Sequence, residues 1–100
     1  MIRILNLNPS ENLIAGNYND GDIVMCICDA TTEAFTITLL DCKSVDQVTF
    51  KFVKSDPGGN RVTLSARTDL NQKLSGEDTQ ILPIQGYLLI YNSDGDSGYW

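Results

Sequence analysis

The chain has 100 residues, of which 42% are hydrophobic and 20% are charged, values typical of one folded globular domain and not of a disordered chain. Thirteen Asp and Glu residues against seven Lys and Arg residues give a net charge of −6, which argues against a nucleic-acid partner because such binding depends on basic side chains that neutralise phosphates. Apolar runs of at most five or six residues are too short to span a membrane, and the N-terminus carries no signal-peptide pattern.

The N-terminal half alternates short apolar runs with turn residues. Residues 2–5 predict a short first strand that stops at Asn8-Pro9. Residues 23–29 are almost entirely apolar and β-prone, a pattern typical of a strand covered on both faces. After a turn, residues 34–40 alternate apolar side chains with Thr, which predicts a strand with one buried face.

The centre of the chain has the pattern of two strands joined by a tight turn. Residues 48–54 and 61–66 each alternate apolar and polar side chains, and residues 55–60 (SDPGGN) supply turn chemistry. This order predicts a β-hairpin in which Gly58 and Gly59 adopt positive φ. The two glycines do not predict a phosphate loop, because no G-x-x-x-x-G-K-[ST] pattern is present.

The C-terminal third holds two more predicted strands. Residues 67–77 are polar and predict a loop with one short strand or turn, and residues 78–82 predict a strand that ends before a proline. Residues 86–91 (GYLLIY) predict a strong strand, followed by a turn and the start of a last strand at Tyr99 and Trp100. Strands that recur every 8–14 residues predict an all-β fold, a small antiparallel β-sandwich or a barrel-like domain.

The sequence contains no pattern that predicts a catalytic or metal site. It has no His, and its three cysteines are an odd number that does not fit a secreted disulfide framework. Cys26 and Cys28 share one strand face and are expected to be small buried side chains. The Asp-Gly-Asp runs at residues 20–22 and 94–96 lack the spacing of an EF-hand and predict turns. We therefore expect a non-enzymatic protein without a cofactor or a metal.

Aromatic residues gather toward the C-terminal end: Tyr87, Tyr91, Tyr99 and Trp100. Rings of this kind complete a core or a subunit interface, and exposed rings stack on sugars. The sequence leaves both interpretations open. In the second, the protein is a carbohydrate-binding module for host surface glycans, and Tyr91, Tyr99 and Trp100 are the expected glycan contacts.

The order of these elements resembles a β-module widespread in structural proteins of tailed bacteriophages, in tail fibres, head fibres and related appendages. The resemblance rests on FTITLL at 35–40, the segment 48–64 around SDPGGN, LSG at 74–76, LLIYNSDG at 88–95 and GYW at 98–100. It covers residues 20–100, about four fifths of the chain. Asp41 departs from the family pattern because a proline is common there, and the chain ends at Trp100 where members continue for a few strand residues.

What the resemblance implies is a non-enzymatic virion structural protein, made in the host cytoplasm, that assembles as a homotrimer. Residues 20–100 then form the β-domain, and residues 1–19 are expected to form an arm with a short strand that docks on a capsid or tail protein. The apolar side chains expected to make that contact are Ile2, Ile4, Leu5 and Leu7. Because the chain starts at Met1 with little beyond the module, a capsid-attached head fibre, a decoration protein or a small tail-fibre component is favoured over the tip of a long fibre.

Overall fold

The computed structural model describes residues 1–10, 12, 14, 18–86, 88–93 and 100. Within these residues the chain forms seven strands and two short 3-10 helices, joined by turns and loops. The strands are β1 (Ile2–Leu7), β2 (Ile23–Cys28), β3 (Phe35–Thr38), β4 (Thr49–Lys54), β5 (Val62–Ser65), β6 (Thr79–Leu82) and β7 (Leu88–Asn92). The helices are η1 (Cys42–Ser44) and η2 (Thr68–Leu70). Every strand overlaps a segment in which alternation or an apolar run predicted one.

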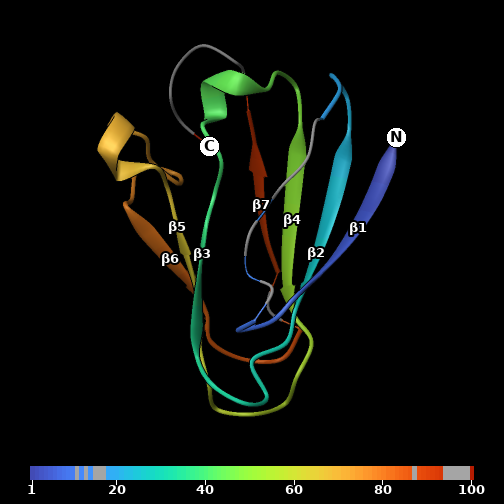
Figure 1. Ribbon diagram of the computed structural model, residues 1–100, viewed down its shortest axis with the longest axis vertical. Coiled ribbons are helices and arrows are strands. Elements are labelled where there is room, and N and C mark those ends of the chain that lie inside the picture. Colours follow the sequence, from blue (N-terminus) through green and yellow to red (C-terminus); the bar gives the residue numbers. More distant parts are fainter. Residues whose placement is uncertain (11, 13, 15–17, 87, 94–99) are drawn as a thin grey trace.

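The strands form two mixed sheets that pack face to face (Figure 1). One sheet has the order β1-β2-β4-β7 and the other the order β3-β5-β6. From β2 to β5 the chain crosses to the other sheet after every strand, so β2 and β4 run parallel, as do β3 and β5. The all-β class is confirmed. The expected antiparallel pairing holds for β4–β7 and β5–β6 and is wrong for β1–β2, β2–β4 and β3–β5.

The predicted central hairpin is wrong, although both of its strands exist. β4 lies between β2 and β7 in the four-stranded sheet, whereas β5 lies between β3 and β6 in the other sheet. The segment 55–61 is therefore a crossover between the sheets. Its glycines also differ from the prediction, because the described glycines with positive φ are Gly21, Gly76 and Gly86.

A buried ion pair holds this crossover in shape. The Lys54 side chain is fully buried, and its ammonium donates to Asp56 Oδ2 at 2.8 Å, to the Asp56 carbonyl at 3.0 Å and to the Gly58 carbonyl at 2.8 Å. An ammonium has three donors, so all of them are satisfied. The Asp56 carboxylate accepts from the Ala30 amide at 2.8 Å and from the Gly58 amide at 3.1 Å. A Cβ at Gly58 would come within 3.1 Å of Asp56 Oδ2, so glycine permits this close approach.

The same contacts tie the two crossovers together. Asp56 binds the Ala30 amide in the β2–β3 crossover, and the Asn60 side chain donates to the Ala30 carbonyl at 2.9 Å. The Ser55 amide donates to the Cys28 carbonyl at 2.8 Å. Both crossovers lie at one end of the sandwich, the lower end in Figure 1. The chain from β2 to β5 therefore forms two stacked turns of a coil, and the ion pair fixes the second turn on the first.

Aromatic rings fill the space between the sheets. The Phe50 ring lies 5.3 Å from that of Tyr18, 5.3 Å from that of Trp100 and 6.2 Å from that of Phe52, measured between centroids. Phe52 in turn contacts Tyr91 at 6.1 Å. The edge-to-face geometry of three of these four pairs adds to the stabilisation that apolar burial provides.

The cysteines are part of this core. Cys26 and Cys28 are free and buried, as expected, and Cys42 is buried as well. Burial raises the pKa of Cys26 and of Cys28 to about 12, so both are neutral thiols at physiological pH. They act as small apolar side chains.

The N-terminal segment is built into the domain, whereas the sequence predicted an arm over residues 1–19. β1 pairs with β2 over its whole length, and Leu7 and Ile14 are buried in the core. The buried Asp22 carboxylate lies 3.3 Å from the Met1 amino group and 3.2 Å from Arg3 Nε. The predicted boundary after residue 19 therefore cuts through a sheet and through the charge cluster around the buried Asp22.

We expect Asp56→Asn to lower the free energy of unfolding at neutral pH by about 3–5 kcal/mol, because it leaves the buried Lys54 ammonium without its charge partner. Urea unfolding of the two proteins measures the difference. A loss below about 1 kcal/mol, the size of an exposed pair, would contradict the role assigned to this contact.

The pH dependence of that difference is a control. Burial alone raises the pKa of Asp56, but the hydrogen bonds from Lys54, Ala30 and Gly58 outweigh it and hold the pKa below its ordinary value. Such a carboxyl stabilises the fold above its unfolded pKa of about 3.9, and this contribution disappears as the pH falls through the folded pKa. The stabilities of the wild-type protein and of Asp56→Asn should therefore approach each other below about pH 4.

Candidate interaction surface

The outer face of the four-stranded sheet is mostly apolar. Successive side chains of a strand point to opposite faces, and the buried positions of the four strands mark the inward face. The remaining twelve positions align in three rows across the sheet and are named the outer face. Eight of them are apolar: Ile2, Ile4, Ile23, Met25, Ile27, Val53, Leu88 and Ile90. The other four are Asn6, Thr49, Lys51 and Asn92.

The apolar side chains on the edge strands are the most exposed part of this face. Ile2 and Ile4 on β1 are 72% and 63% exposed, and Leu88 and Ile90 on β7 are 46% and 50% exposed. The outward side chains of β2 and β4 are half-buried by their neighbours in the sheet. Continuous apolar patches on a protein surface mark interaction sites. The sequence signal for this face is the unbroken apolar character of residues 23–28, which suits a strand covered on both sides.

One positive charge lies near the middle of the outer face. Lys51 occupies the middle row, in register with Met25 on β2 and Ile90 on β7. None of the twelve positions carries a carboxylate. At one corner the Thr49 hydroxyl donates to Asn92 Oδ1 at 2.6 Å, which forms a polar margin. The outer face is thus an apolar surface with one ammonium, in a chain whose net charge is negative.

The four side chains predicted to dock on another protein divide between the two faces of β1. Ile2 and Ile4 belong to the outer face and are exposed, as docking requires. Leu7 is buried and Leu5 packs against the core, so the prediction is wrong for these two. The reason is the two-residue period of the strand, which sends odd-numbered and even-numbered side chains to opposite faces.

Two of the three predicted glycan contacts lie in the core. Tyr91 is buried against Phe52, and its hydroxyl donates to Gln80 Oε1. Trp100 is buried against Phe50. Neither ring presents a face on which a sugar can stack, so the prediction is wrong for both. Tyr99 lies outside the described residues.

A groove of about 410 Å³ lies between the edge strands β6 and β7. Its lining residues are Thr79, Gln80 and Ile81 of β6 and Leu89 of β7. The hydrogen bond from Tyr91 to Gln80 joins the two sheets beside it. Ile81 at the groove is exposed, so this side of the sandwich also presents apolar surface to solvent. No local pattern predicts such a groove, because it depends on which strands end the two sheets.

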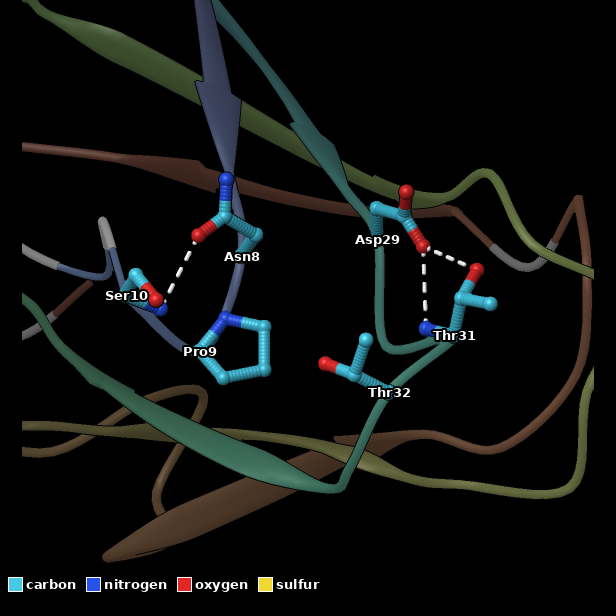
Figure 2. A pocket seen from close by; sticks show the side chains of 6 residues that line it. All are labelled: Asn8, Pro9, Ser10, Asp29, Thr31 and Thr32. Carbon is cyan, nitrogen blue, oxygen red and sulfur yellow. Dashed lines mark hydrogen bonds between the residues drawn. The ribbon is translucent and has the colours of Figure 1, made fainter.

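A polar pocket of about 270 Å³ lies where β1 and β2 end (Figure 2). Because the two strands are parallel, the residues that follow them meet at one edge of the sheet. Figure 2 shows residues 8–10 on one side and Asp29, Thr31 and Thr32 on the other. Asp29 Oδ1 accepts from both the amide and the hydroxyl of Thr31, which shapes the turn. These groups can hydrogen-bond a small polar molecule, and the described lining includes no aromatic ring for a sugar.

Other classes of site find little support in the residues described. Among them, no three His, Cys, Asp or Glu side chains form a group that could hold a metal ion. No described helix is long and apolar enough to cross a membrane. Comparisons with protein-family models, with curated proteins and with solved structures found no match. The outer face therefore remains the strongest candidate for a functional surface.

A pair of substitutions on β1 tests the division between the faces. In protein dilute enough for the copies to be dissociated, we expect Leu7→Ala to cost about 2–5 kcal/mol of folding free energy because it leaves a cavity in the core, whereas Ile4→Ala should change this free energy by about 0.5 kcal/mol or less. Thermal or urea unfolding measures both. Equal losses in the two variants would show that the faces of β1 are assigned incorrectly.

Proposed function

We propose that this chain is a non-enzymatic structural protein of a tailed-bacteriophage virion. It is a capsid-attached head fibre, a decoration protein or a small tail-fibre component, made in the host cytoplasm and incorporated into the particle. It assembles as a homotrimer and docks on other virion proteins. The observation that carries the proposal is the outer face, an apolar sheet surface that needs a protein partner.

The sequence resemblance supports the class of protein. The segments that resemble the phage β-module contain β3, β4, β5 and β7, and all four strands are present. They contribute to both sheets, so the resembling segments are not confined to one layer, although β1 lies outside the match. The all-β class that the module implies is the class observed.

The size of the outer face supports an assembly. Four strands about 4.8 Å apart and five or six residues long, at about 3.3 Å per residue, cover on the order of 400 Å². Eight of the twelve side chains on this area are apolar, and a largely apolar face on a small protein is frequently a binding surface. A chain of 100 residues also buries a limited core by itself. Covering the outer face between copies adds apolar burial that one chain cannot provide.

The chemistry of the described side chains supports a non-enzymatic role. Cysteine acts as a nucleophile in its thiolate form, and the raised pKa values of the buried Cys26 and Cys28 keep both as thiols. The buried carboxylates of Asp22 and Asp56 are engaged by cations and by backbone amides. These groups stabilise the fold and are not available to a substrate.

Light scattering tests the assembly. We expect a mass three times the 11.0 kDa of one chain. The double substitution Ile4→Glu with Ile90→Glu should produce a folded monomer, because it places two carboxylates on the apolar face. The matched control, Thr36→Glu with Thr38→Glu, adds the same charge at exposed positions of β3 and should leave the mass unchanged. A monomeric wild-type protein at millimolar concentration would contradict the proposed trimer.

The virion assignment has its own test, mass spectrometry of purified particles of the virus that encodes the chain. The proposal predicts the chain in the particles, at a copy number divisible by three. Its absence from particles, with the protein abundant in the infected cell, would refute a structural role in the virion.

A further inference from the structure

We propose that the outer face of one copy docks on the β6–β7 groove of a second copy, with Lys51 facing Glu77, in a head-to-tail contact that closes into a ring. The inference rests on the proposed function for the existence of an assembly. It adds which two surfaces meet and which charges select the arrangement. Four observations support it.

The first observation is the position of Lys51. A two-fold dimer through the outer face would place that face against itself. Lys51 occupies the middle row on a central strand, so both ammonium groups would enter the same apolar layer. None of the outer-face positions supplies a carboxylate to either of them. Because burying an unpaired charge is costly, Lys51 disfavours the two-fold dimer and favours a contact between two different surfaces.

The second observation is that the groove side supplies what the outer face lacks. Ile81, which lines the groove, gives it an exposed apolar side chain. Glu77 and Asp78 come immediately before β6 and are exposed. Asp78 already pairs with Lys73, whereas none of the ion pairs among the described residues involves Glu77. Glu77 is therefore the carboxylate that we assign to Lys51 of the neighbouring copy.

The third observation is that the two surfaces share β7. Leu88 and Ile90 point to the outer face, while Leu89 lines the groove. The surfaces are thus adjacent sides of one sandwich and meet along an edge strand (Figure 1). Adjacent contact surfaces give a subunit the shape of a wedge. Wedge-shaped subunits in head-to-tail contact form a ring when the rotation between neighbours closes, and an open filament when it does not.

The fourth observation concerns area. A two-fold contact through the outer face alone buries on the order of 400 Å² per copy, about half of the roughly 800 Å² per partner in a standard stable interface. In a ring, each copy buries its outer face against one neighbour and its groove side against the other. Each contact still covers about 400 Å² per partner, but a copy makes two of them and buries about 800 Å² in total, twice what the two-fold dimer would bury.

A charge exchange tests the contact. Lys51→Glu and Glu77→Lys are made singly and together, and sedimentation equilibrium measures the dissociation constant. Lys43→Glu and Glu33→Lys are matched controls, because both residues are exposed and lie outside the two surfaces. Each single variant should weaken assembly by about tenfold or more, and the double variant should recover to within about threefold of wild type. The controls should match wild type.

Three outcomes would overturn the inference. In the first, the wild-type protein is a trimer, but the single variants self-associate as tightly as wild type, or the double variant self-associates more weakly than either single variant. The proposed ring contact is then wrong, and the proposed function stands. A wild-type two-fold dimer is the second. In the third, the wild-type protein is monomeric, which overturns the trimer as well. Circular dichroism checks that each variant folds. If Lys51→Glu does not fold, Lys51→Gln and Glu77→Gln replace the charge exchange in a double-mutant cycle. Non-additive effects on the dissociation constant then support the contact, and additive effects overturn it.

Discussion

The path of the chain between its two sheets depends on a buried lysine–aspartate pair. Lys54 ends β4 and its ammonium donates to oxygens of Asp56 and Gly58, while the Asp56 carboxylate accepts from the Ala30 amide in the preceding crossover. Both charges are removed from water, so neither can lose its partner without a large penalty. The second turn of the coil is thereby anchored on the first. β4 lies beside β2 and β5 beside β3 as a consequence.

This coiled path accounts for the surface that the molecule presents. Parallel neighbours come from successive crossovers, and together with the flanking strands β1 and β7 they build a sheet that is apolar on both faces. The inner face receives the Phe50 and Phe52 rings and the buried cysteines. The outer face keeps isoleucines in contact with water, at a free-energy cost that a neighbouring copy would remove in the proposed assembly. Stability and the proposed assembly therefore depend on the same sheet, and Lys51 near its centre would limit how copies can meet.

The sequence predicted the strands because alternation is a local property, visible for example in Phe35, Ile37 and Leu39. It did not predict which strands pair, because the decisive contacts join distant residues, such as Asp56 with Ala30. One local signal was available. Lys54 occupies one of the alternate positions of β4 whose side chains point into the core, and it stands two residues before an aspartate. This pattern indicates a buried ion pair. The same alternation places the Ile4 side chain on the outer face of β1 and the Leu7 side chain in the core. The groove and the polar pocket had no such signal, since each is formed by residues from strands that pair or end together only in the fold.

The most direct test of the central claim, that a second copy covers the outer face in solution, is methionine oxidation followed by mass spectrometry over a range of protein concentrations. Met25 lies on the outer face, and the largely exposed Met1 provides the internal reference. If a second copy covers the outer face, oxidation of Met25 slows as the protein concentration rises, while oxidation of Met1 changes less. Equal oxidation rates for Met25 at all concentrations, up to the millimolar range, would show that the outer face stays open to water and that no second copy covers it.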